Sequence, residues 1–181
     1  MHVLVSAASK HGATAGIENH IGETLRQRGF AVTVAEPDQA KPEASYDGIV
    51  LGSGVYAGHW LKDAKNLATR IAACDPAPPV WVFSSGPLGD PSKPDEEPVD
   101  VASIVEAVAP VEHRIFAGKI DKSELGFGER AIMVAVRAPD GDFRDWDEIA
   151  TWANEIADAL EPAQEATYRP LTPELLVGSS T

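Results

Sequence analysis

The chain has 181 residues, of which 44% are hydrophobic and 24% are charged, and this suits one soluble globular domain with a sizeable core. Its net charge of −13 argues against non-specific binding to nucleic acid or to anionic membranes. Cys74 is the only cysteine, which excludes an intrachain disulfide and a cysteine-based metal site. Because the sequence shows neither an apolar leader nor a run of about 18 apolar residues, we expect a cytoplasmic protein without a membrane span.

Hydrophobic periodicity predicts strands and helices that alternate along the chain. Short apolar runs predict five strands, over residues 2–6, 30–34, 47–51, 80–83 and 113–119. Apolar residues at helical spacing predict helices over residues 13–29, 60–73, 99–109 and 146–160. Cys74 then lies near a helix end, where we interpret it as a small apolar residue in preference to a catalytic thiol.

Two segments carry a weaker pattern. Residues 125–136 fit a helix or an inserted strand, and we favour the helix. The helical pattern of the last helix ends at Pro162. We therefore predict one domain over residues 1–161 and a loose tail over residues 162–181.

The alternation of strands and helices predicts an α/β fold with a parallel sheet and helices on both of its faces. Five strands at this spacing fit a flavodoxin-like three-layer sandwich with the strand order 2-1-3-4-5. In that order the first, third and fourth strands lie side by side. Ligands of such sheets bind beyond the carboxyl ends of the strands, where the strand order reverses.

Segments of glycine, serine and other small residues follow these same three strands, at residues 9–14, 52–60 and 84–90. The first segment lies between a strand and a helix, where free backbone N–H groups and the helix dipole attract an anion. It contains neither a Walker A sequence nor G-x-G-x-x-G, so taken alone it fits a phosphate loop or an ordinary capped turn. Convergence of the three segments on one sheet edge favours a phosphate that carries a flat ring.

The loop of residues 9–14 is similar to the flavodoxin phosphate loop, in which hydroxyl residues and a glycine precede a threonine on the helix. The chain resembles FMN-binding domains of the flavodoxin type over roughly residues 2–160. The resemblance is closest to the menaquinone-dependent protoporphyrinogen oxidase branch, in residues 46–53, 56–59, 116–118 and 145–160.

This resemblance implies FMN as the cofactor, although the loops alone do not separate FMN from a deazaflavin. The residues that it implies for cofactor binding are Ser9, Lys10, His11, Gly12, Ala13, Thr14, Ser53, Gly54, Val55, Tyr56, Ala57, Ser84, Ser85, Gly86, Pro87, Leu88, Gly89 and Asp90. The chemistry then takes place on the flavin, so we assign no catalytic side chain.

Several aromatic and histidine side chains lie near the implied cofactor. Tyr56 either stacks on the ring or packs against the base of the loop. His59 either contacts the flavin or caps the following helix, and we favour the cap. We expect Trp60 and Trp81 in the core, and no metal at His11, because no second ligand stands at a suitable spacing.

Three functions follow from this interpretation. The favoured one is an FMN-dependent oxidoreductase that passes electrons or hydride from a reduced donor to a quinone-like acceptor, as in protoporphyrinogen oxidase. The alternatives are an acidic electron-transfer flavodoxin without its own substrate pocket and a binding module of this fold that lacks FMN. The chain differs from the oxidase branch at Tyr56, where that branch has a basic residue, and at Ala7 and Ala8, which replace a loop hydroxyl. The expected partner is a redox protein or a quinone-like small molecule, and the sequence leaves the oligomeric state open.

Overall fold

The computed structural model describes residues 1–42, 45–56, 58–86, 101–121, 123 and 140–161. Its strands are β1 (His2–Ala8), β2 (Ala31–Val34), β3 (Gly48–Tyr56), β4 (His59–Trp60), β5 (Val80–Gly86), β6 (Glu112–Ala117), β7 (Lys119–Ile120) and β8 (Gly141–Asp142). Its helices are α1 (Ala13–Gln27), α2 (Lys62–Ala72), α3 (Val101–Val108) and α5 (Trp146–Leu160).

Five parallel strands form the centre of the molecule in the order β2-β1-β3-β5-β6. This is the predicted flavodoxin-like order, so the predicted fold class is confirmed. The short strand β4 turns back from β3 and pairs with it antiparallel, which the sequence pattern did not predict. Strands β7 and β8 form a separate antiparallel pair.

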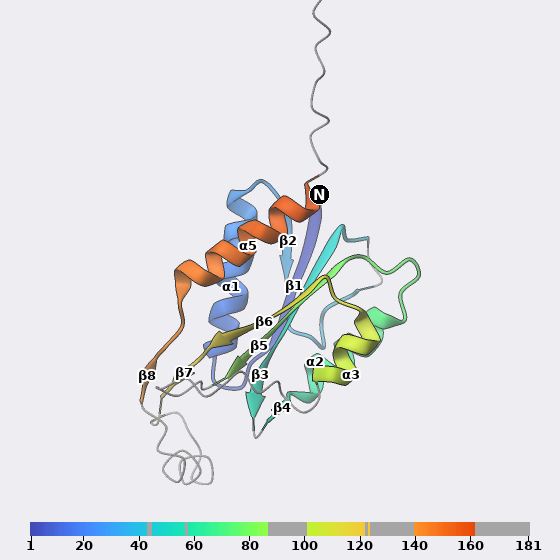
Figure 1. Cartoon of the computed structure of the whole chain (residues 1–181). Helices are drawn as coiled ribbons and strands as arrows, with labels where there is room; N and C mark the ends of the chain where they lie inside the picture. The colour runs from blue at the N-terminus through green and yellow to red at the C-terminus, as the bar shows by residue number, and fades with distance from the viewer. Residues whose placement is uncertain (43–44, 57, 87–100, 122, 124–139, 162–181) are drawn as a thin grey trace, which may run out of the picture.

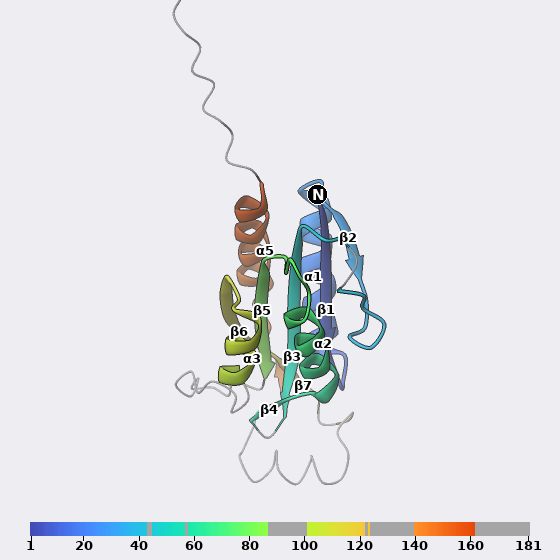
Figure 2. The ribbon, with the colours of Figure 1, turned by 90° about the vertical axis from the view of Figure 1, so that its right-hand side faces the viewer.

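Helices cover both faces of the sheet, with α1 and α5 on one face and α2 and α3 on the other (Figures 1 and 2). The α1/α5 face buries Ile17, Phe83 and Trp152 against the sheet. The opposite face buries Leu51 and Leu67 in a second apolar cluster. The central strands β1, β3 and β5 are thus buried from both sides, which explains their continuous apolar runs.

The central strands are longer than predicted, because small residues that suggested loops continue the ladder. Ala8 pairs with Ser53, which in turn pairs with Ser84. A Cβ atom on Gly52 would lie 2.1 Å from Cζ of Phe83, so the Phe83 ring occupies the space above this glycine. Glycine here makes room for a neighbouring aromatic side chain and does not mark a turn.

The remaining boundaries shift by a few residues. The predicted fifth strand is divided at Gly118 into β6 and β7, and α2 begins at Lys62 because Trp60 belongs to β4. The helix that we predicted over residues 125–136 and the tail over residues 162–181 lie outside the described residues. None of the described helices combines the length and the apolar composition that crossing a membrane requires.

Candidate functional site

The carboxyl ends of β1, β3 and β5 lie next to one another at one edge of the sheet, at the bottom in Figure 1. The register continues to this edge, where Ala8 pairs with Ser53 and Gly54 pairs with Ser85. The structure therefore brings together the ends of these three strands, as predicted from the strand order.

Helix α1 starts at this edge without a capping side chain. Its N-cap residue is Gly12, whose φ of 77° is left-handed, and no side-chain hydrogen bond caps the helix. The first turn contains no acidic residue. A Cβ atom on Gly12 would meet no atom of the described residues within 4 Å, so the backbone here is open to approach. The first N–H groups of α1 and the positive end of its dipole are thus available to an anion.

The hydroxyl of Ser9 is buried in this loop and has no hydrogen-bond partner among the described residues. A buried hydroxyl without a partner costs about 1–3 kcal/mol. An oxygen of a bound phosphate is an acceptor that removes this cost. The loop therefore fits the phosphate group of FMN.

The end of β3 packs against the same loop. A Cβ atom on Gly54 would lie 3.0 Å from Oγ1 of Thr14, which itself is buried. The ring of Tyr56 lies 5.9 Å from the ring of His11, measured between centroids, and the Nζ atom of Lys10 lies 5.3 Å from the Tyr56 centroid. Tyr56 thus stands beside the phosphate loop, where an aromatic ring can cover a flat ligand.

Two of the predicted site serines use their hydroxyls inside the protein. Ser53 Oγ accepts from the N–H of Leu61 at 3.0 Å and donates to the carbonyl of Gly54. Ser84 Oγ accepts from Nε1 of Trp60 at 2.8 Å and lies 3.0 Å from Nε2 of His113. Their hydroxyls hold β4 and the start of α2 against the sheet, and both residues are paired in the parallel ladder.

The end of β5 lies close to the end of β3. A Cβ atom on Gly86 would lie 3.4 Å from Cβ of Val55, so these two predicted site residues are neighbours. Ser85 is buried. Five other predicted site residues lie outside the described part of the chain, namely Ala57, Pro87, Leu88, Gly89 and Asp90.

The prediction that His59 caps α2 is wrong. His59 is an exposed residue of β4 paired with Tyr56, and the N-cap of α2 is Leu61 without a side-chain cap. The chain turns back after Tyr56, so His59 belongs to this hairpin and precedes the N-cap position of α2. Trp60 and Trp81 are buried, which confirms their expected place in the core.

The sequence pattern missed Glu18, a carboxyl group directly beneath the phosphate loop. Glu18 is 4% exposed, and its Oε1 accepts from the N–H of Ala7 at 2.9 Å. Burial raises its pKa from 4.5 to about 7 against the effect of this hydrogen bond, with a further contribution from Glu36. Its position one residue after Ile17, on the apolar face of α1, was the available signal.

The sequence pattern also missed Arg144, which follows β8. Its Nη1 donates to the carbonyl of Ala13 in the first turn of α1 at 3.2 Å, although 131 residues separate the two. Its guanidinium also binds Asp142 and lies 4.4 Å from the ring centroid of Trp146. No local pattern could have paired it with α1.

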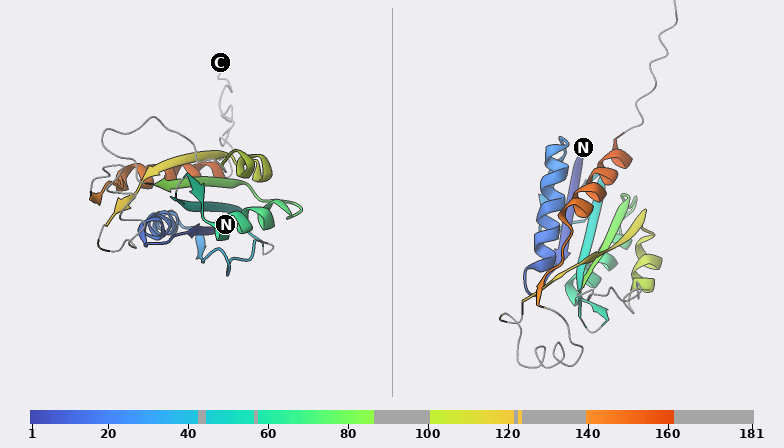
Figure 3. Two further views of the ribbon diagram at one scale, coloured as in Figure 1. Left: turned by 90° about the horizontal axis from the view of Figure 1, so that it is seen from below. Right: turned by 60° about the vertical axis from the view of Figure 1, so that its left-hand side comes forward.

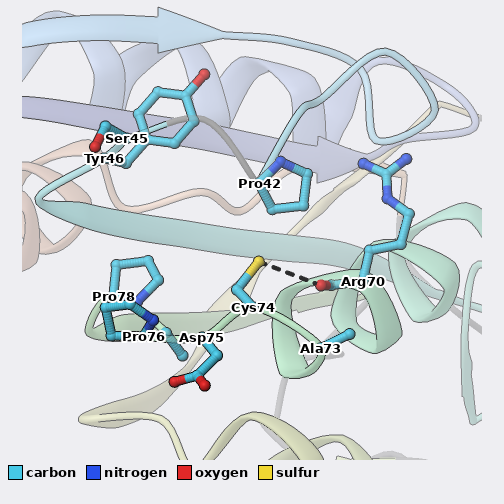
Figure 4. Close-up of a pocket in the computed structure, with 10 residues that line it drawn as sticks. Pro42, Ser45, Tyr46, Arg70, Ala73, Cys74, Asp75, Pro76 and Pro78 are labelled. Atoms are coloured by element: carbon cyan, nitrogen blue, oxygen red, sulfur yellow. Dashed lines mark hydrogen bonds between the residues drawn. The ribbon is translucent and has the colours of Figure 1, made fainter.

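Two cavities open on the described surface. One of about 540 Å³ adjoins the phosphate loop and is lined by Ala8, Ser9, Lys10, Glu36, Pro37, Asp38, Leu61, Lys62 and Asp63. The other, of about 630 Å³, lies at the amino ends of β3 and β5, where Tyr46, Arg70 and Cys74 line it (Figure 4). Cys74 Sγ there donates to the carbonyl of Arg70. Among the described residues, no group of three or more His, Cys, Asp or Glu side chains is arranged to hold a metal ion.

A family model described as a flavodoxin domain matches residues 4–147. The chain belongs to the flavodoxin domain family. Homologues with this domain bind FMN. No curated protein sequence matches the chain.

Solved structures show the same fold at low sequence identity. A flavodoxin from the domain Archaea is 16% identical with a TM-score of 0.59, over 90% of this chain and 100% of that one. A flavodoxin of Streptococcus pneumoniae TIGR4 is 15% identical with a TM-score of 0.57, over 88% and 97%. Rubredoxin oxygen:oxidoreductase from the anaerobe Desulfovibrio gigas is 14% identical with a TM-score of 0.60, over 88% of this chain but only 36% of that longer one.

Proposed function

We propose that this flavodoxin-domain protein binds FMN at the carboxyl edge of its sheet and uses it to transfer electrons. Family membership and the geometry of the phosphate loop support the proposal. The Ser9 hydroxyl, Thr14 and the first backbone N–H groups of α1 would hold the phosphate. The observation that carries the proposal is the buried Ser9 hydroxyl without a partner, next to a helix start without a cap.

The ends of β3 and β5 would orient the ring. When bound, FMN supplies a ring system that takes up and releases electrons. Tyr56 lies beside the phosphate loop, and Gly86 lies against Val55, so the ends of β3 and β5 are neighbours next to this loop. Backbone groups at Gly54 and Gly86 would contact the ring edge, because the side chains of Ser53 and Ser84 are already hydrogen-bonded inside the protein.

For the electron partner, we propose a protein with a basic docking surface. The net charge of −13 favours association with such a surface, and complementary charge raises association rates at low salt. A quinone-like acceptor, as the resemblance to protoporphyrinogen oxidases implies, is the second candidate. To separate the two candidates, the rate at which the reduced protein is oxidised is measured with a soluble quinone and with a basic redox protein. Each rate is measured at low and at high salt.

Replacement of two buried serines in β1 and the loop after it tests the cofactor site. In Ser9→Ala the unpaired hydroxyl is removed, so we expect the stability without FMN to be unchanged or higher and the Kd for FMN to rise roughly tenfold. Ser6→Ala is the matched control, because Ser6 Oγ donates to the carbonyl of Ala35 at 2.6 Å. We expect Ser6→Ala to lower the free energy of unfolding by about 1 kcal/mol and to leave the Kd unchanged.

Fluorescence titration with FMN and urea unfolding of both variants give the two readouts. The same FMN affinity in Ser9→Ala and the wild-type protein would remove Ser9 from the phosphate site. Failure of the wild-type protein to bind FMN would overturn the proposed function itself and favour a binding module of this fold without cofactor.

A further inference from the structure

Arg144 reaches the first turn of α1 from the opposite end of the chain. Its side chain is only 12% exposed, and its Nη1 donates to the carbonyl of Ala13 at 3.2 Å. Figure 3 shows β7 and β8 beside the N-terminal end of α1, in agreement with the hydrogen bond from Arg144 to Ala13.

Gly16 provides the space that the guanidinium of Arg144 occupies on α1. A Cβ atom on Gly16 would lie 2.4 Å from Nη1 of Arg144, far inside contact distance. Glycine destabilises a helix interior relative to alanine, so its presence here calls for a local reason. The space that the Arg144 guanidinium occupies against Gly16 is such a reason.

A cation at a helix N-terminus opposes the helix dipole. Asp142 offsets this, because its carboxylate accepts from Nε of Arg144 at 2.8 Å and from Nη2. The Arg144 guanidinium in turn holds the pKa of Asp142 below its ordinary value, so the pair stays charged near neutral pH. Arg144 is thus suited to hold the turn in place, with its charge balanced by its own neighbour.

A chain of hydrogen bonds leads from Arg144 to the end of β5. The N–H of Phe143 donates to the carbonyl of Gly118 at 3.1 Å, and the N–H of Gly118 donates to the carbonyl of Gly86 at 2.9 Å. A Cβ atom on Gly118 would lie 3.1 Å from that same Gly86 oxygen, so the approach is tight. These bonds, together with the bond from Arg144 to Ala13, therefore link the first turn of α1 to the end of β5 at Gly86.

We propose that Arg144 is a positioning residue for the cofactor, which holds the phosphate-binding turn of α1 at a set distance from the end of β5. This inference rests on the proposed function, because it assigns Arg144 to the same FMN site. FMN bound at this site would contact both the first turn of α1 and the end of β5, whereas riboflavin, which has the ring without the phosphate, would contact only the end of β5.

The test compares Arg144→Gln, Gly16→Ala and the double variant with the control Arg28→Gln. Arg28 is the matched arginine at the other end of α1, where it binds Asp158 and Glu161 of the α5 end. Gly16→Ala keeps the arginine but displaces its guanidinium, and alanine favours the helix itself. We measure the Kd for FMN and for riboflavin and, in the protein without ligand, the amide exchange of Gly16 and Ile17.

We expect Arg144→Gln and Gly16→Ala each to raise the Kd for FMN roughly tenfold and to speed exchange of the two amides. The Kd for riboflavin stays within about twofold, and Arg28→Gln changes none of these quantities. Because both substitutions break one contact, the double variant binds FMN no more weakly than Arg144→Gln alone.

Wild-type FMN affinity in both single variants would overturn the inference, as would an equal loss of riboflavin and FMN binding. If the wild-type protein binds no FMN, the proposed function fails, and amide exchange then decides the positioning role alone. Unchanged exchange in both variants contradicts that role, and faster exchange in both supports it.

Discussion

Helices α1 and α5 pack on the same face of the sheet but begin in opposite ways. At α5, the Asp145 side chain accepts from the N–H groups of Asp147 and Glu148, and these two acids complement the dipole in the first turn. At α1, the N-cap is Gly12, and neither a capping side chain nor an acid is present in the first turn. Helix α5 supplies its own negative charge, whereas the first turn of α1 has none.

The acidic residues of the two helices differ in burial as well. The acids that begin α5 are exposed, but α1 carries Glu18 inside, where its carboxylate binds the N–H of Ala7. The start of α5 is completed by the protein's own residues, whereas the start of α1 is the one at which we propose ligand binding. Three changes test this contrast, taken from the largest expected effect to the smallest.

The largest effect concerns Glu18. Its pKa is near 4.5 in the unfolded chain and about 7 in the folded protein, so between these values the folded state binds the extra proton. Stability is therefore highest below pH 4.5 as far as this group is concerned, and it falls by about 3 kcal/mol as the pH rises to 7. We expect Glu18→Gln to remove this loss, since its Oε1 still accepts from Ala7, and to be more stable than wild type at pH 8.

Urea unfolding between pH 4.5 and 8 measures this change. Glu148→Gln is the control for loss of an acid at an exposed helix start, and it should leave the fall in stability between pH 4.5 and 7 in place. Equal pH dependence in wild type and Glu18→Gln would show that Glu18 does not retain its proton in the folded protein.

The second effect concerns the start of α1. Proline cannot adopt the φ of 77° that Gly12 has, so Gly12→Pro must rebuild the loop between β1 and α1. We expect the Kd for FMN to rise about a hundredfold, by analogy with the cost of misplacing a binding group by 1 Å. Isothermal titration with FMN measures the loss, and wild-type affinity in Gly12→Pro would contradict the phosphate assignment.

The smallest effect concerns the start of α5. Asp145→Ala removes a capping side chain that accepts two backbone N–H bonds, and we expect the free energy of unfolding to fall by about 1 kcal/mol. The Kd for FMN should not change, because the start of α5 is capped by the protein's own residues and is not part of the proposed site. A loss of FMN affinity in Asp145→Ala, measured by the same titration, would break the distinction between the two helices.

The strand order could be predicted because alternating apolar runs and right-handed crossovers leave few topologies open. The strand ends could not, since Gly52 suggests a turn until the Phe83 ring above it is known. Ser84 was predicted beside the cofactor, but the bonds of its hydroxyl to Trp60 and His113, which lie far away in sequence, could not be predicted. Long-range partners of this kind leave no trace in local periodicity.

The phosphate loop was predicted from a glycine and hydroxyls before a helix together with two similar segments at the same sheet edge and the resemblance to flavodoxins, because the loop alone also fitted a capped turn. Its supports were not predicted. The place of Glu18 on the apolar face of α1 was a signal, but its bond to Ala7 and the contact of Arg144 with Ala13 arise only through the fold. The sequence could therefore indicate a candidate phosphate loop, whereas the residues that support this loop were found only in the structure.

The most direct measurement is a titration of the wild-type protein with FMN and with riboflavin under the same conditions. If the open start of α1 binds the phosphate, FMN binds at least roughly tenfold more tightly than riboflavin, and added inorganic phosphate weakens FMN binding. Equal affinity for the two ligands, or no binding of either, would contradict the account.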